Sequence, residues 1–147
     1  AINHSIDTRY DEQKIVSHDN VKMDCLSIDK LMPLIETEDY KNSDVVVVEE
    51  AQFFDDSIIE VSKILASKNK RVIAAGLDTD YLGKPFGPMP KIMCEADYLD
   101  KLRAICIKCG NPASYTQRTT SDANQVVIGE LDKYEARCRN CHKLPKN

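Results

Sequence analysis

The sequence predicts an α/β protein, in which a domain built on a parallel β-sheet is followed by a small zinc-binding β module. An apolar segment at 43–50, an amphipathic segment at 55–70 and a second apolar segment at 71–78 follow one another closely. This order is typical of a βαβ unit, with parallel strands and a right-handed crossover. Two Cys-x-x-Cys pairs then occur toward the end of the chain. We therefore expect an α/β domain over residues 1–103 and a zinc-binding module over residues 104–147.

The composition limits the size and the partners of the protein. The chain has 147 residues, of which 42% are hydrophobic, enough for one ordinary domain or a domain with a small appendage. Its formal net charge of -4, with both signs interspersed, gives no indication of a broad nucleic-acid or membrane surface. No apolar run approaches the roughly 20 residues that a membrane span needs, and the opening AINHSIDTRY shows no signal-peptide pattern. We therefore expect no nucleic-acid partner and no membrane partner.

The segment at 24–40 precedes the predicted βαβ unit. It is expected to begin extended and to become helical from about Ile28, because Leu31, Leu34 and Ile35 then share one face. Proline is tolerated in the first turn of such a helix, so the proline in this segment does not exclude it.

Each element of the βαβ unit has its own signal. Four consecutive valines, Val45 to Val48, predict a strand buried on both faces. Apolar residues near helical spacing and acidic residues in the first turn predict a helix over 55–70. A second buried strand is predicted at 71–78, and KPFGPMP at 84–90 breaks the chain. Short strand-like pieces follow at 100–107, 113–119, 124–129 and 133–138.

Four of the six cysteines form the two Cys-x-x-Cys pairs, which are separated by residues 110–137. They are Cys106, Cys109, Cys138 and Cys141. This spacing predicts one tetrahedral zinc site, with His142 as an alternative ligand to Cys141. The competing interpretations are two disulfides, which are less expected in a chain without a secretory signal, or reduced core cysteines. The other two cysteines, Cys25 and Cys94, are expected to be buried apolar residues.

Two carboxylates, Glu49 and Glu50, directly follow the run of valines, and Leu77 and Asp78 end the next predicted strand. In open parallel sheets, ligands bind beyond the carboxyl ends of the strands. An apolar strand that delivers an acid to a metal-bound phosphate is a Walker B arrangement. One carboxylate can then face Mg²⁺ while its neighbour, which points the other way along the strand, serves as a general base. Alternatively, one glutamate caps the following helix and the other is solvated.

Six motifs occur in one order along the chain: DTRY, SHD, EEAQFFDD, GLDTDYLGKPFG, a Cys-x-x-Cys pair with ASYTQR, and VVIGELDKYEARCRNC. With these motifs the chain resembles, over essentially its whole length, the small zinc-containing thymidine kinases of the cytosolic human and bacterial kind. The resemblance implies a cytoplasmic enzyme that transfers the γ-phosphoryl group of ATP to the 5′-hydroxyl of thymidine or deoxyuridine, with Mg²⁺ accompanying ATP and structural zinc. Members of this family are commonly homotetramers inhibited by thymidine triphosphate.

The resemblance also implies roles for individual residues. Glu50 falls on the family's general base, and Asp7, Arg9 and Glu49 fall near the phosphates and Mg²⁺, although the family usually has Asp where this chain has Glu49. Arg118 matches a family arginine to which we assign no role. The positions implied to bind the nucleoside are Gln52, Phe53, Leu77, Tyr81, Phe86, Thr116, Val127, Ile128, Gly129 and Tyr134. Of these, residues 127–129 and Tyr134 belong to a loop that closes over the base in the family.

One family motif has no counterpart in the sequence. The phosphate-binding loop G-x-x-x-x-G-K-[ST] is approached only by DTDYLGKP at 78–85, which has Asp in place of the first glycine and Pro in place of the hydroxyl residue. In the family this loop, the first strand and the first helix lie upstream of DTRY. We therefore expect a P-loop-type domain that lacks this N-terminal unit, and little or no kinase activity from the 147-residue chain alone.

Two other functions are compatible with parts of the sequence. A catalytically inactive protein that binds thymidine or thymidine triphosphate would explain the missing phosphate loop, but Glu50 and Gln52 speak against it. A zinc-ribbon module that binds nucleic acid or protein would explain the cysteines. The second half is not strongly basic, however, and has few aromatic residues for base stacking.

Overall fold

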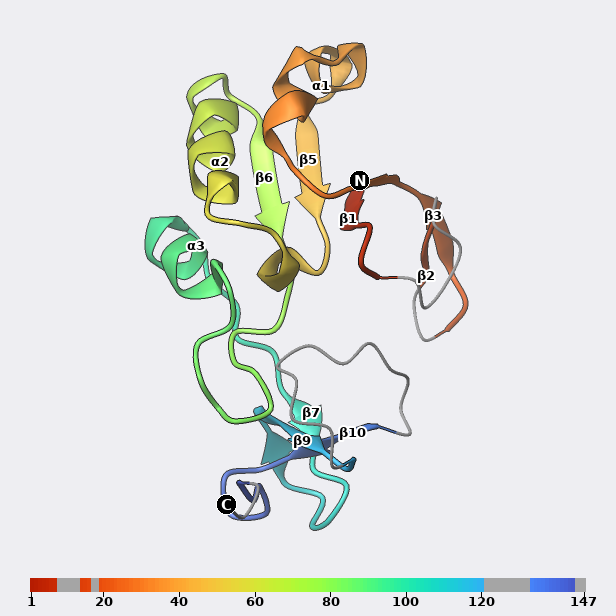
Figure 1. Ribbon diagram of the computed structural model, residues 1–147, viewed down its shortest axis with the longest axis vertical. Coiled ribbons are helices and arrows are strands. Elements are labelled where there is room, and N and C mark those ends of the chain that lie inside the picture. The colour runs from red at the N-terminus through yellow and green to blue at the C-terminus, as the bar shows by residue number, and fades with distance from the viewer. Residues whose placement is uncertain (8–13, 17–18, 121–132, 145–147) are drawn as a thin grey trace. The chain divides into compact units, whose positions relative to one another are not determined.

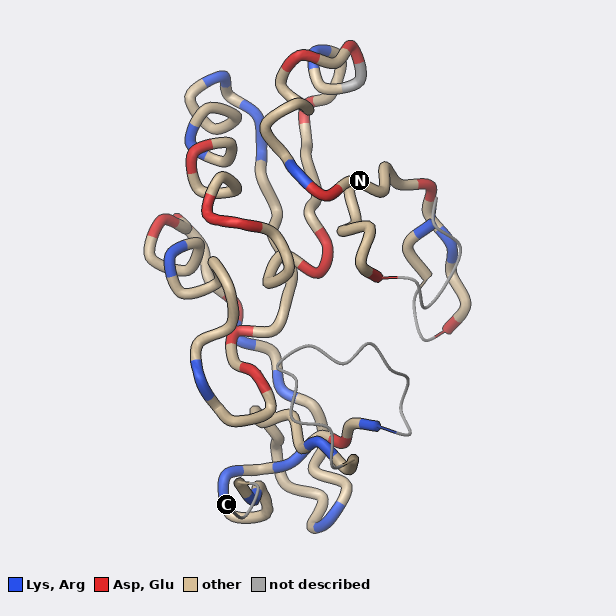
Figure 2. Tube along the Cα trace, viewed as in Figure 1, with Lys and Arg blue, Asp and Glu red and all other residues tan. Residues whose placement is uncertain are grey.

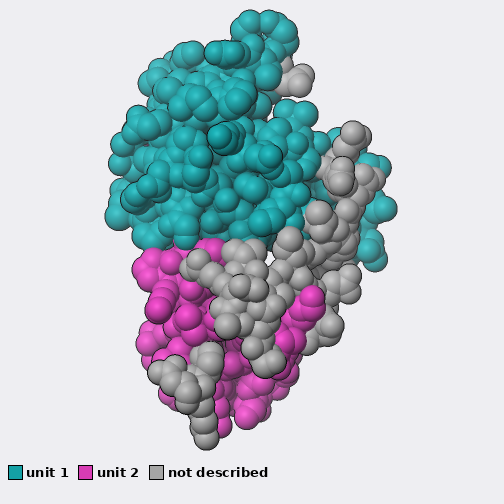
Figure 3. All heavy atoms as spheres, in the orientation of Figure 1, with its two compact units in different colours: residues 1–78, 87–96 teal, residues 79–86, 97–147 magenta. Residues whose placement is uncertain are grey.

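The computed structural model describes residues 1–7, 14–16, 19–120 and 133–144. The chain divides into two compact units (Figure 3), which we call the sheet unit (1–78 and 87–96) and the cysteine unit (79–86 and 97–147). The segment 79–86 interrupts the sheet unit in sequence yet groups with the cysteine unit.

The sheet unit is built on four parallel strands in the order β4-β1-β5-β6, of which Figure 1 labels β1, β5 and β6. The strands are β1 (Ile2–His4), β4 (Leu26–Ile28), β5 (Val45–Val48) and β6 (Arg71–Ala74). Helix α2 (Ser57–Ser67) connects β5 to β6 and packs on β6. The predicted α/β class and the βαβ unit are therefore confirmed.

The valine strand is not buried on both faces as expected. Val46 and Val48 are buried, whereas Val45 is 45% exposed. The register pairs Val45 with Arg71, which is also exposed, so these side chains share one face of the sheet. Only the opposite face of β5 packs into the core within the described residues. A run of valines indicates a strand, but it does not report which faces other elements cover.

The core of the sheet unit lies between the sheet and its helices. The buried residues of α2 recur at helical spacing and face this core, as the sequence predicts. Leu31 and Leu34 pack into it as well, so the apolar face predicted for the segment at 24–40 is correct. The buried members of the core are Ile2, Leu31, Leu34, Tyr40, Val46, Val48, Ala51, Phe54, Ile58, Ile59, Val61, Leu65 and Met89.

The helix predicted to begin near Ile28 is instead divided into two short ones. Strand β4 runs to Ile28, a 3-10 helix η1 (Met32–Glu36) follows, and α1 (Glu38–Asn42) begins after Thr37. The side chain of Thr37 accepts a hydrogen bond from the backbone N–H of Tyr40, which caps α1. A local cap therefore starts a new helix where the spacing of apolar residues indicated a continuous one.

Several elements of the sheet unit were not predicted from the sequence. Strands β2 (Lys14–Val16) and β3 (Lys22–Asp24) form an antiparallel pair, and α3 (Met89–Glu95) follows the proline-rich segment. Proline at the start of α3 is compatible with a helix, because the first-turn N–H groups have no partner within the helix. The prolines at 84–90 therefore precede and open a helix rather than only breaking the chain.

The cysteine unit consists of short antiparallel pairs. Strand β7 (Ala104–Ile105) pairs with β8 (Pro112–Ala113), and β9 (Tyr115–Arg118) pairs with β10 (Tyr134–Arg137). The strand predicted at 124–129 lies outside the described residues. Across the part of the chain that the structure describes, no helix has the length and apolar character required to cross a membrane.

Candidate functional site

The two consecutive glutamates follow β5 at the point where β5 and β6 both end, beside the first residue of β1. The backbone N–H of Glu49 donates to the carbonyl of Ile2 in β1 at 2.9 Å. Two residues later, Ala51 donates in the same way to Ala75, directly beyond β6, at 2.9 Å. Glu50 therefore lies at the carboxyl edge of the sheet, where ligands bind in open parallel folds. Figure 2 shows this acidic position at the end of β5.

Glu50 has an unusual backbone conformation. Its φ of 52° and ψ of 41° lie in the left-handed region, and the 3-10 helix η2 (Ala51–Phe53) begins immediately after it. Among the described residues, the other non-glycine residues with positive φ are Asn20 and Asn69. Asparagine tolerates this region far better than glutamate does. Strained backbone of this kind costs roughly 1–3 kcal/mol and concentrates at functional sites.

The side chain of Gln52 connects Glu50 to the end of β6. Gln52 is 3% exposed. Its Nε2 donates to Glu50 Oε2, and its Oε1 accepts from the backbone N–H of Leu77 at 3.0 Å. Both ends of the buried amide thus have partners, and the carboxylate is held toward the strand ends. Because Glu50 makes no capping hydrogen bond to η2 with its side chain, the structure gives no support to a capping role.

Two glycines allow the chain to pack closely around Gln52. A Cβ atom on Gly76 would lie 2.4 Å from Gln52 Oε1, and one on Gly87 would lie 2.1 Å from the Gln52 carbonyl oxygen. Gly87 also has a φ of +49°. These are the first and last residues of the motif GLDTDYLGKPFG. Both contacts exclude a larger side chain, so the packing around Gln52 requires glycine at both ends of the motif.

Further polar groups lie at the end of β1. Asp7 Oδ2 accepts from Asn3 Nδ2 at 3.3 Å, and the Asp7 backbone donates to the His4 carbonyl at 2.9 Å. The His4 ring packs edge-on against Phe54 at 4.6 Å and Phe53 at 6.1 Å. Burial lowers the pKa of His4. Sequence reasoning singled out Asp7 and Phe53 but missed Asn3 and His4, although the end of a parallel strand is itself a signal for ligand-facing side chains.

In the cysteine unit, Arg118 brings together two residues that the sequence indicated for nucleoside binding. Its guanidinium carbon lies 3.6 Å from the centre of the Tyr81 ring and 5.3 Å from that of Tyr134. Its Nη2 donates to the Tyr134 hydroxyl at 2.9 Å. Arg118 is 7% exposed. Phe86 is buried in this unit too, and Thr116 is half-buried on β9. Arg9, Val127, Ile128 and Gly129 lie outside the described residues.

The four cysteines of the two Cys-x-x-Cys pairs lie together, as predicted. Their sulfur atoms are all within 4.8 Å of one another, and Cys109 and Cys138 are 3.6 Å apart. Four thiolates about 2.3 Å from one tetrahedral zinc ion would be about 3.8 Å apart, so this donor set fits zinc. All six cysteines are free, and 3.6 Å is far longer than a disulfide bond. Cys25 is buried as expected, but Cys94 is exposed on α3, so that expectation was wrong.

The thiols of this group differ in acidity. Burial raises the pKa of Cys106, but hydrogen bonds at its sulfur outweigh burial and lower the pKa to about 6. Hydrogen bonds with the Cys138 and Cys109 thiols raise the pKa of Cys141 to about 12. One thiol thus ionises readily while another keeps its proton. Because a metal binds thiolates, metal binding would release the remaining protons.

His142 has partners other than the cysteine group. Its Nε2 lies 3.0 Å from the backbone carbonyl oxygen of Tyr81, which can only accept, so this nitrogen carries the proton. Its ring stacks on Tyr115 with centroids 4.9 Å apart. The potential metal ligands found among the described residues are the four cysteines, without His142.

A parallel sheet with a glutamate at its carboxyl edge and a second unit with four clustered cysteines, both in one chain, are the combination expected of a zinc-containing nucleoside kinase. The family model for thymidine kinase matches residues 1–142. The chain belongs to the thymidine kinase family, which confirms the resemblance drawn from its motifs. It is 44% identical over 141 residues to a thymidine kinase of Rhodothermus sp. (strain ITI 518). That match covers 96% of this chain and 65% of the relative, so the chain spans about two thirds of its relative's length.

The packing of Gln52 against Gly87 can be tested with a pair of alanine variants. We expect Gly110→Ala to cost about 1–2 kcal/mol of unfolding free energy, because Gly110 also has a positive φ but has no atom within 4 Å of its missing Cβ. Gly87→Ala should cost clearly more, because a clash with Gln52 is added to the same backbone penalty. Urea unfolding followed by circular dichroism measures both values. Equal losses of unfolding free energy in the two variants would show that glycine is needed at position 87 only for its positive φ and not for the packing against Gln52.

Proposed function

We propose that the protein is a thymidine kinase, which transfers the γ-phosphoryl group of ATP to the 5′-hydroxyl of thymidine, and of deoxyuridine, to give the monophosphate. The observation that carries this proposal is the conformation of Glu50, which is strained at the carboxyl edge of the sheet and held there by the buried amide of Gln52. Membership of the thymidine kinase family supports the substrate class.

In this proposal Glu50 is the general base. An ionised carboxylate can only accept hydrogen bonds, and it has about four lone-pair sites. The Gln52 amide holds Oε2, and the carboxylate accepts the proton of the 5′-hydroxyl as the new P–O bond forms and the bond from the γ-phosphorus to ADP breaks. Phosphoryl transfer depends mainly on positioning and charge stabilisation, which explains why a rigid support for this carboxylate matters.

The phosphates and their metal ion would be bound by residues near the same edge. Asp7 lies just beyond β1, and Glu49 is hydrogen-bonded to β1 through its backbone. Carboxylate oxygens are the ligands that Mg²⁺ prefers, so this donor set fits the ion, with Arg9 proposed as a further phosphate ligand. When bound with ATP, Mg²⁺ would neutralise charge on the phosphate oxygens.

The residues that we propose to bind the nucleoside are those that the resemblance implies. They are Gln52, Phe53, Leu77, Tyr81, Phe86, Thr116 and Tyr134, together with the loop residues 127–129. We also propose the other properties that the resemblance implies, which are a cytoplasmic location, a homotetramer and inhibition by thymidine triphosphate.

We propose that Cys106, Cys109, Cys138 and Cys141 hold a structural zinc ion. The first pair lies between β7 and β8, and the second pair follows β10. A metal bound by all four would join two chain segments that are distant in sequence and support the strands between them.

The kinase proposal is tested by the rate of thymidine phosphorylation, with ATP and Mg²⁺, in the natural protein and its Glu50→Gln variant. We expect kcat to fall by roughly 10²- to 10⁴-fold while thymidine still binds, because the amide cannot accept the proton. The exposed helical residue Glu60 provides a matched control, and Glu60→Gln should leave kcat unchanged. A natural protein that binds thymidine but does not phosphorylate it would contradict the kinase function. An active Glu50→Gln variant would contradict the role of Glu50.

The zinc proposal predicts one zinc ion per chain in the purified protein, measured by inductively coupled plasma mass spectrometry. Cys138→Ser should lose the ion, because it removes one of four ligands, whereas Cys94→Ser should keep it, because Cys94 lies outside the group. Full zinc content in Cys138→Ser would contradict the proposed ligand set.

A further inference from the structure

The segment 79–86 is a compact loop with its own internal bonds. Asp80 is 3% exposed, and its Oδ1 accepts from the backbone N–H groups of Leu82 and Lys84 at 2.9 and 3.0 Å. Gly83 donates to the Asp80 carbonyl, and Asp80 to the Lys84 carbonyl, both at 2.9 Å. These internal bonds and the contacts that hold the loop from outside stabilise the same conformation, so losing the outside contacts should also loosen the internal bonds.

The first external contact is made by Arg118 of β9. Its guanidinium group lies over the face of the Tyr81 ring and also donates to the Tyr134 hydroxyl of β10. A planar cation over an aromatic face is attractive, and more so when both groups are shielded from water. Arg118 and Tyr81 are both buried, so this contact is well shielded.

The second external contact is made by His142. Its Nε2 donates to the Tyr81 carbonyl, and its ring stacks on Tyr115. Tyr115 in turn faces the loop at Gly83, where a Cβ atom would lie 3.5 Å from the Tyr115 ring. Side chains from β9 and from the segment after the second cysteine pair thus hold the loop at two adjoining points.

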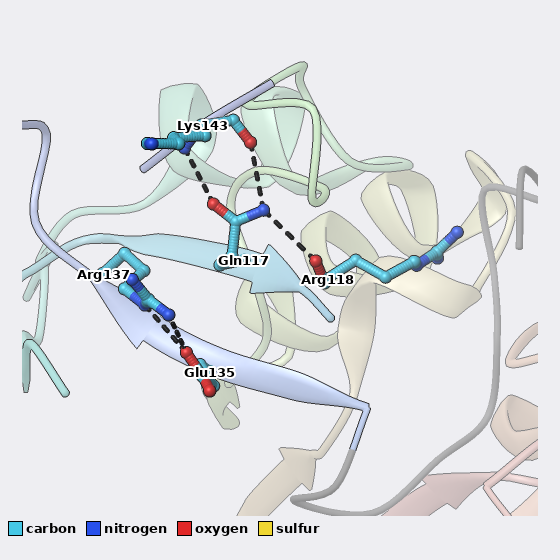
Figure 4. A network of polar contacts seen from close by, with 5 residues as sticks. All are labelled: Gln117, Arg118, Glu135, Arg137 and Lys143. Atoms are coloured by element: carbon cyan, nitrogen blue, oxygen red, sulfur yellow. Dashed lines mark hydrogen bonds and ion pairs between the residues drawn. The ribbon is translucent and has the colours of Figure 1, made fainter. Parts of the chain in front are cut away.

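His142 belongs to the same turn as two of the clustered cysteines. The backbone N–H groups of Cys141 and His142 both donate to the Cys138 carbonyl, at 3.0 and 2.9 Å. The next residue is also fixed, because Gln117 of β9 bonds the backbone of Lys143 through both ends of its amide, at 2.7 and 3.0 Å (Figure 4). A metal that fixes Cys138 and Cys141 would therefore also fix His142 and, through it, Tyr81.

We propose that Arg118 and His142 are positioning residues, which couple metal binding at the four cysteines to the placement of Tyr81 for thymidine. The role of Tyr81 in thymidine binding rests on the proposed function. The coupling itself is a property of the cysteine unit and does not require kinase activity. Since coupling between two sites is reciprocal, thymidine binding should also slow the loss of metal to a chelator.

Amide hydrogen exchange measured by mass spectrometry tests the coupling on the zinc-loaded natural protein. The amides of Asp80, Leu82, Gly83 and Lys84 are hydrogen-bonded in the loop, so loosening it should expose them. We expect the peptide covering 79–86 to exchange about tenfold faster in Arg118→Met, and faster also in His142→Phe, which keeps an aromatic ring on Tyr115 but cannot donate. Removing the metal with a chelator should have the same effect.

Arg137→Met is the matched control, because Arg137 lies on β10 and pairs with Glu135 rather than with the loop (Figure 4). It should leave the exchange of 79–86 unchanged, and α2 should be unaffected in every variant. Arg118→Lys, which keeps the charge but not the planar group, should give a smaller increase and provides the test if Arg118→Met does not fold.

Unchanged exchange of 79–86 in zinc-loaded His142→Phe and in the foldable Arg118 variant would overturn the coupling. In the kinase assay, His142→Phe should raise KM for thymidine and leave kcat nearly unchanged, because the loop still reaches its position at saturating thymidine. If the natural protein does not phosphorylate thymidine, the proposed function fails, whereas the exchange experiment still decides the coupling.

Discussion

The carboxyl edge of the sheet is organised around one buried amide. Gln52 lies between the ends of β5 and β6 and uses both ends of its side chain, donating to Glu50 and accepting from the backbone of Leu77. Leaving either end of a buried amide without a hydrogen-bond partner would cost free energy. The Gln52 side chain is therefore held in the one orientation that satisfies both ends. The surrounding chain packs tightly against this residue, since a side chain at position 76 or 87 would clash with Gln52. The strained conformation of Glu50 persists because these contacts determine it from several directions.

The cysteine unit is also organised around polar side chains, which here are the four clustered cysteines. Its strands are short, and its small core includes Cys106 and Cys138. Small domains with little apolar core gain stability from a metal or other cross-links. The contacts of Arg118 and His142 extend this order to a loop that the sequence places between two segments of the sheet unit. Each unit thus has one buried polar side chain, Gln52 or Arg118, close to residues that we propose to bind the nucleoside.

The sequence was sufficient for features that depend on local pattern. The valines of β5, the helical spacing in α2 and the two cysteine pairs each predicted an element or cluster that the structure contains. The sequence was insufficient for features that depend on contacts between residues far apart in the chain. The exposure of Val45 depends on what covers the sheet, and one partner of Arg118 is Tyr81, which lies far earlier in the chain. The left-handed backbone of Glu50 was equally hidden, because nothing in its own neighbourhood favours that conformation.

The role of Gln52 in holding Glu50 is tested most directly by kcat for thymidine phosphorylation in Gln52→Met, measured on the natural protein at saturating thymidine and ATP with Mg²⁺. Methionine fills a similar volume but cannot donate to the carboxylate. If the amide orients the general base, kcat falls on the order of 10²-fold even when the substrate sites are filled, because small misplacements of a catalytic group are that costly. An unchanged kcat with only a raised KM would show that Gln52 contributes to binding and that Glu50 keeps its position without it.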